Sequence, residues 1–156
     1  MPLHPTDILL LSRQFGRYYV EQFSPMLERT GLSINEIHVL LFLVNNPAYN
    51  TARDVTELRG LGKSQVSQAV ELLAGRGLLT RIPDGEDRRV VHLILTEAGR
   101  ASAGEAREIQ AQCGRQLTAE LTDAEQAQLD ALLNKIADNA GALAKKGTEN
   151  HGTKRH

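Results

Sequence analysis

The stretch of residues 62–95 constrains the fold more than any other part of this chain. It opens with a predicted helix over residues 63–76, whose apolar residues recur at helical spacing and are Val66, Val70 and Leu73. Gly77 is well placed to end this helix, because glycine readily adopts the left-handed conformation of a helix terminus. Two strand-like runs follow, at 78–82 and 90–95, separated by residues typical of turns. We therefore predict a helix followed by a β-hairpin.

The polar residues of this helix and hairpin are of kinds that contact DNA. A helix fits the major groove, and a cationic hairpin tip suits the narrow, negative minor groove. Glutamine can pair bidentately with adenine, and serine bonds to bases or phosphates. The candidate contacts on the helix are Lys63, Ser64, Gln65, Ser67 and Gln68, and those at the hairpin tip are Asp87, Arg88 and Arg89. Candidate contacts with the DNA backbone are Thr51, Arg53 and Arg81.

The charge balance does not by itself favour nucleic acid as the partner. The formal net charge is −1, and residues 53–92 hold seven lysines and arginines against six aspartates and glutamates. What matters for DNA binding is the local charge, which here is barely positive. A winged-helix module that binds another protein and not DNA therefore stays open as an alternative.

The rest of the chain is predicted to be helical. A first helix over residues 6–29 should be kinked or split by Pro25, and a second over 34–44 begins with the capping box Ser33 to Glu36. Thr51 caps a short third helix, in which Ala52, Val55 and Leu58 should face inward. A turn with two glycines joins it to the helix at 63–76 as a helix-turn-helix. A fifth helix should span 96–121, and a sixth begins with the capping box at Thr122.

The first, fifth and sixth helices are too long and too apolar to belong to so small a unit. A second copy of the chain is the simplest partner for their apolar stripes. The residues expected at this dimer interface are Ile8, Leu11, Leu129, Leu132, Leu133 and Ile136.

The expected fold is mainly α with a small β-hairpin wing, a winged helix-turn-helix with long N- and C-terminal dimerisation helices. The expected divisions are an N-terminal dimerisation helix, a DNA-binding lobe, C-terminal dimerisation helices and a disordered tail, at residues 6–32, 33–95, 96–144 and 145–156. The tail prediction rests on the absence of apolar periodicity there.

Composition narrows the remaining possibilities. A single cysteine cannot form an intrachain disulfide, and no signal peptide or membrane-spanning run is found, so we expect a cytoplasmic protein. Cys113 lies on an apolar helical stripe and reads as a core residue, although a redox role stays open. The histidines lack metal-ligand spacing, and we find no catalytic set or phosphate loop. We therefore expect no metal, no cofactor and no enzymatic activity.

The order and spacing of three motifs resemble the MarR family of bacterial winged helix-turn-helix regulators. The motifs are Gly77-Leu78-Leu79, Asp87-Arg88-Arg89 and Leu95-Thr96-Glu97-Ala98-Gly99. The resemblance covers about residues 6–143. It implies a homodimer on a pseudo-palindromic double-stranded operator, usually a repressor released by a small molecule, for example a phenolic effector, or by an oxidant. In the wing, Asp87 is expected to hold an arginine by a charge-assisted bond. By the family's D-x-R pattern, Arg89 is the residue that enters the minor groove, and Arg88 reaches phosphate or a helix.

The resemblance also places an effector pocket where the DNA-binding lobe meets the dimerisation helices. Residues with an apolar body and a polar end that could line it, together with one neighbouring phenylalanine, are Tyr18, Tyr19, His38 and Phe42. An oxidant- or metal-sensing regulator of the same fold is the other alternative. The chain departs from the family at Gly62, where a serine commonly caps the recognition helix, and at Glu86, whose charge is unhelpful beside DNA.

Overall fold

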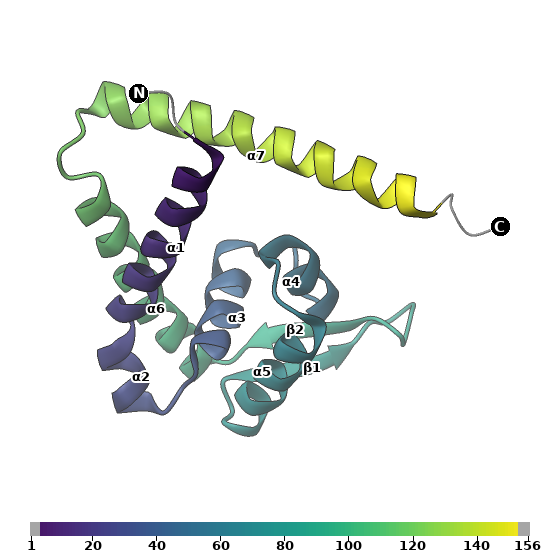
Figure 1. Ribbon diagram of the computed structural model, residues 1–156. Helices are drawn as coiled ribbons and strands as arrows, with labels where there is room; N and C mark the ends of the chain where they lie inside the picture. Colours follow the sequence, from purple (N-terminus) through teal and green to yellow (C-terminus); the bar gives the residue numbers. More distant parts are fainter. Residues whose placement is uncertain (1–3, 153–156) are drawn as a thin grey trace. The chain divides into compact units, whose positions relative to one another are not determined.

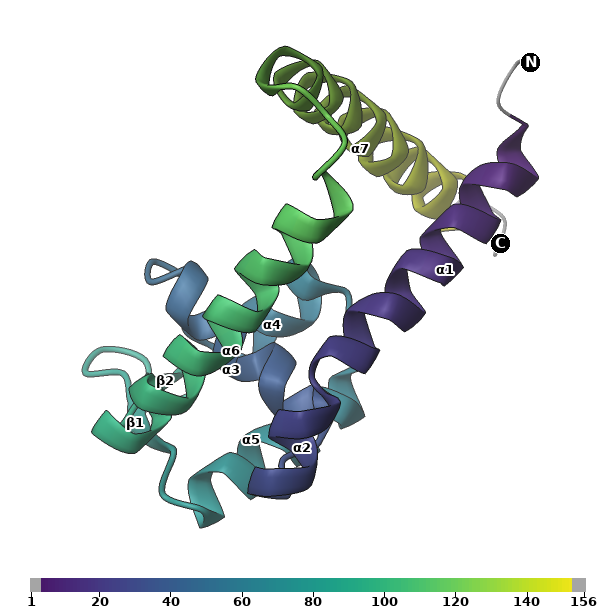
Figure 2. The same cartoon turned by 90° about the vertical axis from the view of Figure 1, so that its left-hand side faces the viewer.

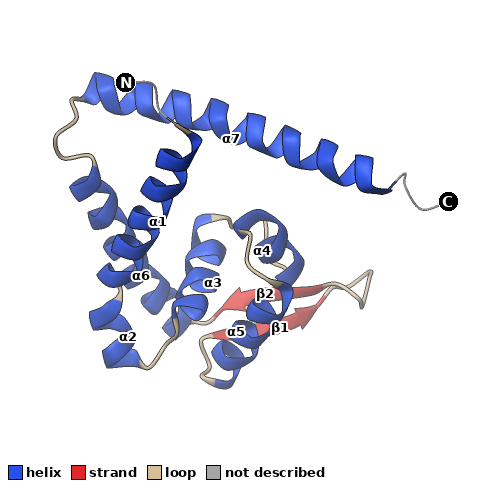
Figure 3. Cartoon of the chain, viewed as in Figure 1, coloured by secondary structure: helices blue, strands red, loops and turns tan. Residues whose placement is uncertain are grey.

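The computed structural model describes residues 4–152, and the chain divides after Gly114 into two compact units. Figure 1 follows the chain by colour, and Figure 3 separates helices from strands. The elements are α1 Pro5–Gln22, α2 Ser24–Thr30, α3 Ile34–Asn45, α4 Ala52–Arg59, α5 Lys63–Gly75, β1 Leu79–Pro83, β2 Val91–Leu95, α6 Glu97–Leu117 and α7 Asp123–Gly152. This order confirms the expected mainly helical fold with a hairpin wing.

The helix boundaries follow local chemistry. The predicted split of the first helix occurs at Phe23, and Pro25 takes a place in the first turn of α2, where its missing N–H costs no hydrogen bond. Capping boxes at Ser33 and Thr51 open α3 and α4. Gly77, with a φ of 70°, ends α5, and the Leu78 N–H donates to the Leu73 carbonyl over 2.9 Å, as in a Schellman motif.

The hairpin is a two-stranded antiparallel sheet whose register runs from Leu79 opposite Leu95 to Pro83 opposite Val91. Its attachment to the helices lies at β2, where the Leu93 N–H donates to the Asn50 carbonyl over 2.7 Å. The loop beyond the strands projects away from the helices in Figures 1 and 3.

Helix α3 lies at the centre of the core of the first unit. Residues 39–43 are all buried, and side chains from α2, α4, α5, both strands and α6 pack around them. Helix α6 contributes Ala103 and Ala106, and the Asn45 amide donates to Gln110 over 3.1 Å, so α6 runs along α3 (Figure 2). Small residues on α6 let the two helices approach closely.

Two expectations about the ends of elements need correction. Helix α6 ends at Leu117 and not at residue 121, because Thr122 caps α7 through its bonds with Glu125. Helix α7 continues through residues 145–152, where we expected a disordered tail; residues 153–156 lie outside the described part. Residues 145–152 hold two lysines, two glycines and no apolar residue, so this end of α7 continues the helix without an apolar stripe for packing.

A further correction concerns α4. We expected Ala52 and Leu58 to face inward with Val55, but only Val55 is buried, and Leu58 is 59% exposed. Because α4 has only about two turns, it packs on the core through Val55 and leaves Leu58 in solvent. Among the described residues, no helix combines the length and the apolar character needed to cross a membrane.

Candidate nucleic-acid interface

Helix α5 has two faces with different chemistry. The face toward the core holds Val66, Ala69, Val70 and Leu73, all buried. The opposite face is exposed and holds the candidate contacts Lys63, Ser64, Gln65, Ser67 and Gln68. The apolar spacing of the sequence therefore fixes the rotation of the helix, and this rotation brings all five candidates onto one accessible surface.

The start of α5 is capped by Gln65. Gly62 has no side chain to cap the helix, and the Gln65 Oε1 atom accepts a hydrogen bond from the Gly62 N–H over 3.0 Å. This bond is one half of a capping box; the other half, a side-chain acceptor at position 62, is lacking because the residue is glycine. The Gln65 carbonyl oxygen is therefore engaged within the protein, whereas Gln68 has no such bond with a described residue.

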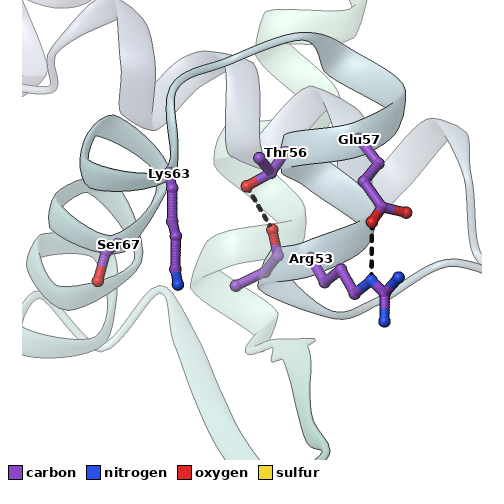
Figure 4. A pocket seen from close by; sticks show the side chains of 6 residues that line it. Arg53, Thr56, Glu57, Lys63 and Ser67 are labelled. Carbon is purple, nitrogen blue, oxygen red and sulfur yellow. Dashed lines mark hydrogen bonds and ion pairs between the residues drawn. The ribbon is translucent and has the colours of Figure 1, made fainter. Parts of the chain in front are cut away.

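A hollow lies between α4 and α5, and Figure 4 shows its lining. Lys63 and Ser67 line it from α5, opposite Arg53, Thr56 and Glu57 on α4. The Thr56 hydroxyl donates back to the Ala52 carbonyl over 2.9 Å, and the Arg53 guanidinium bonds to Glu57 over 2.7 Å. Among the described residues, Lys63 has no carboxylate partner, so its ammonium group is the uncompensated positive charge of this hollow.

The three candidate DNA-backbone residues all have partners within the protein. The Thr51 hydroxyl is part of the α4 capping box with Asp54. Arg53 pairs with Glu57, and Arg81 on β1 pairs with Glu71 on α5. All four charged side chains of the two ion pairs are exposed by 40% or more, so these pairs are weak and can exchange for phosphate.

The wing loop is organised by Asp84. Its Oδ1 atom accepts hydrogen bonds from the N–H groups of Glu86 and Asp87 over 2.8 and 2.9 Å, and its Oδ2 atom lies 3.0 Å from His92 Nε2. The bond from the Asp87 N–H, followed by the bond to His92, lowers the pKa of Asp84 to about 2. The carboxylate is thus charged at neutral pH and holds the loop closed.

The role expected for Asp87 needs correction. We expected its carboxylate to hold an arginine side chain, but its Oδ1 atom accepts from the backbone N–H of Arg89 over 3.0 Å. A short aspartate two residues before an N–H forms this turn readily, which leaves the guanidinium groups free. Arg88 and Arg89 are exposed and make no ion pair with any residue that the structure describes.

Two polar groups escaped the sequence reasoning because they join distant segments. His92 on β2 lies 2.6 Å from Asn50 Oδ1 and bridges it to Asp84. The capping role of Glu36 was expected, but this residue is 1% exposed and also pairs with Arg76 at the end of α5 over 3.1 Å, which was not expected. An acidic residue in the apolar run of α3 was the only available signal of the second group.

The candidate effector residues come only partly together. The rings of Tyr19 and His38 stack 6.3 Å apart, and the Tyr19 hydroxyl accepts from Gln110 over 3.0 Å. Burial and the Arg59 charge lower the pKa of His38 to about 4. Both of its ring nitrogens are buried without a hydrogen-bond partner among the described residues. Phe42 is 6% exposed within the core.

Tyr18 lies elsewhere, against Cys113 on α6. Burial and then the neighbouring thiol raise the pKa of Tyr18, and burial likewise raises the pKa of Cys113. Cys113 is 2% exposed, so its environment favours the neutral, unreactive thiol. Within the described residues, no group of three histidine, cysteine, aspartate or glutamate side chains could hold a metal ion.

Comparisons with known proteins agree with this geometry. Residues 30–90 match the model of the MarR family. The chain is 29% identical over 129 residues to YwaE of Bacillus subtilis (strain 168), an uncharacterized HTH-type transcriptional regulator, covering 83% of this chain and 75% of that one.

The chain is also similar to solved structures of DNA-binding regulators. The chain resembles BpsR of Bordetella bronchiseptica, whose DNA binding is regulated by 6-hydroxynicotinic acid, at 26% identity, a TM-score of 0.68, and coverage of 83% and 98% of the two chains. It also shares its fold with a MarR family regulator of Listeria monocytogenes solved with a 26mer DNA, at 17% identity, a TM-score of 0.79, and coverage of 100% and 99%.

Proposed function

We propose that the chain is a winged helix-turn-helix regulator of the MarR family, which binds a pseudo-palindromic DNA operator as a homodimer and regulates transcription; the match of residues 30–90 to the family's model supports this. One observation carries the proposal. The exposed polar face of α5 and the wing arginines, which pair with no described carboxylate, belong to one winged helix, so a single lobe can contact both grooves.

In this proposal α5 enters the major groove. Gln68 and Ser64 read base edges, and Lys63 bonds to phosphate from the start of the helix, where the helix dipole also favours an anion. Arg89 enters the adjacent minor groove, and Arg88 reaches phosphate. Arg53 and Arg81 exchange their carboxylate partners for the DNA backbone when the lobe docks.

Dimerisation brings two such lobes to one operator. The support is a series of exposed apolar side chains on α1 and α7, which are Ile8, Leu11, Phe15, Leu129, Leu132, Leu133 and Ile136. Their exposures lie between 38% and 59%, and burying such side chains contributes about 25 cal/mol per Å² of apolar surface. The proposed division of the chain follows: dimerisation helices flank the DNA-binding lobe at residues 33–95.

A small aromatic effector is proposed to act at Tyr19 and His38. The support is the pair of buried ring nitrogens of His38, which have no hydrogen-bond partner in the described part of the chain, beside Tyr19, with the Arg59 charge near both rings. A phenolic or acidic ligand would satisfy these groups. We propose that such a ligand releases a cytoplasmic repressor from its operator. An oxidant acting on Cys113 is not favoured, because burial raises the pKa of that thiol.

The nearly neutral charge of residues 53–92 favours one other function, binding to a protein in place of DNA. Gel shifts of the purified protein with promoter fragments, including the region upstream of its own coding sequence, separate the two. Retention of a discrete fragment against excess unrelated DNA supports the proposal. Binding of all fragments equally, or of none, contradicts sequence-specific regulation.

A further inference from the structure

We propose that Asp84 and His92 are positioning residues that fix the wing tip to the helix-turn-helix body through Asn50. The inference rests on the proposed function, in which Arg89 contacts DNA from the wing. These residues hold a part of the hairpin that has little apolar packing. Of its ten strand residues, the buried ones are Leu79 and Leu93, and Ile82, near the loop, is 50% exposed. Apolar packing therefore holds the base of the wing and not its tip.

The first link joins β2 to the connection between α3 and α4. Asn50 makes two bonds there. Its carbonyl accepts from the Leu93 N–H over 2.7 Å, and its side-chain Oδ1 atom lies 2.6 Å from His92 Nδ1. The neighbouring Thr51 forms a β-bridge with His92. Backbone and side chain of one strand residue are thus both held by the body.

The second link crosses the hairpin from His92 to Asp84. The other ring nitrogen of His92, Nε2, lies 3.0 Å from Asp84 Oδ2, so the imidazole spans the body and the wing loop. The remaining oxygen of Asp84 accepts the N–H groups of Glu86 and Asp87. His92 is half-buried, whereas the loop is exposed, so the ring is the last anchored group before the tip.

The third link reaches the arginine. Asp87 accepts the Arg89 N–H through its side chain and the Val90 N–H through its carbonyl, the latter over 2.9 Å. Each group from Asn50 to the backbone of Arg89 is therefore hydrogen-bonded to the next. A loop ordered in advance loses less conformational entropy when it binds. Breaking this series of hydrogen bonds should therefore weaken the contact of Arg89 without removing any group that touches DNA.

Two variants that remove the same charge separate the positioning role of Asp84 from simple electrostatics. Asp84→Ala and Glu86→Ala each remove one negative charge from the same loop, and simple electrostatics predicts that both tighten DNA binding. The Glu86 side chain makes no hydrogen bond with a described residue, so Glu86→Ala is the matched control. We expect Asp84→Ala to weaken binding to an operator with A·T-rich flanks by about tenfold, and Glu86→Ala to leave it unchanged or tighter.

His92→Phe supplies the independent variant, since it keeps an aromatic ring but has no ring nitrogen. We expect the same loss of DNA affinity as for Asp84→Ala, and no further loss in the double variant, because both substitutions break the same series of hydrogen bonds. A readout without DNA is amide hydrogen exchange. The N–H groups of residues 86, 87 and 89 should exchange faster in both single variants, while those of α5 stay protected.

The outcomes separate this inference from the proposed function. If Arg89→Ala weakens binding but Asp84→Ala binds as tightly as Glu86→Ala, the positioning role is refuted and the function stands. Unchanged exchange at residues 86, 87 and 89 in His92→Phe refutes it without reference to DNA. Faster exchange there, together with normal affinity, also overturns it. A parent protein that binds no operator contradicts the proposed function itself.

Discussion

At the scale of single residues, Gln65 holds a position with two competing uses. It lies on the exposed face of α5 among the candidate base contacts, but its carbonyl oxygen caps the helix at Gly62. Because glycine cannot cap with a side chain, this bond secures the end of α5 that would enter the major groove. With glycine at position 62, the cap of α5 therefore depends on the side chain of Gln65.

Gln65→Ala should accordingly act on stability more than on base preference. Loss of the cap should lower the free energy of unfolding by about 1 kcal/mol. Urea denaturation measures this loss, and Ser64→Ala, which removes an exposed side chain from the same turn, is the control. Any loss of DNA affinity should be equal for all operator sequences. A changed base preference at normal stability would show instead that Gln65 reads DNA.

His38 gives a prediction about pH. Its pKa is lowered from 6.5 to about 4 by burial and by Arg59, so the folded protein keeps the ring neutral. Between these values the unfolded chain binds a proton that the folded chain does not, and stability is lost as the pH falls from about 6.5 toward 4. Above this window the ring is neutral in both states and makes no pH-dependent contribution.

His38→Phe should remove this pH dependence. Urea unfolding of the parent and the variant at pH 7 and pH 5 measures it, and the parent should lose more stability between the two conditions. Both proteins share the other titrating groups, so the contribution of these groups cancels when the two changes in the free energy of unfolding are subtracted. Equal losses in both proteins would contradict a neutral, buried imidazole.

At the scale of elements, the hairpin and the start of α6 approach each other closely. The Thr96 hydroxyl donates to the Gly77 carbonyl over 2.7 Å, and the Thr96 N–H donates to the Leu78 carbonyl over 3.1 Å. A Cβ atom on Gly99 would lie 1.8 Å from that same carbonyl oxygen. The end of α5, the start of the wing and the start of α6 thus meet at one point.

Gly99→Ala should therefore force these elements apart. Overpacking of this kind costs about 1–3 kcal/mol, and backbone cannot yield as a flexible side chain can. Thermal or urea unfolding measures the loss. Gly104→Ala on the same helix is the control, since a Cβ there meets no atom of the described residues within 4 Å. Equal stability of the two variants would show that the junction is not tight.

The sequence was sufficient for features that depend on local spacing. Capping boxes at Ser33, Thr51 and Thr122 and the glycine at position 77 fixed helix ends, and apolar periodicity fixed the exposed face of α5. It was insufficient where side chains from distant segments meet. The bridge from Asn50 through His92 to Asp84 spans 42 residues of sequence, and no spacing rule connects these positions. The capping use of Gln65 was missed because glutamine fits both roles.

At the scale of the whole molecule, the exposed apolar side chains of α7 predict a dimer held by that helix and α1. Leu133→Asp should raise the dissociation constant of the dimer at least about tenfold, because a two-fold axis places the new charge in the interface twice. Sedimentation equilibrium measures the constant. Asn134→Asp, which adds the same charge at the neighbouring exposed position, is the control. A parent protein that sediments as a monomer, or a Leu133→Asp variant that remains as dimeric as the control, would contradict the assignment.

The central claim is that two copies of α5 read two symmetric half-sites, and selection from a random DNA library tests it most directly. The parent protein should enrich an inverted repeat whose half-site centres lie about one helical turn apart, or a multiple of it. Gln68→Ala, at unchanged stability, should relax base preference at one position in each half-site, related by the two-fold axis, at a cost of about 1–3 kcal/mol per direct contact. Enrichment of no motif by the parent protein, or an identical motif from the parent and the Gln68→Ala variant, would contradict the claim.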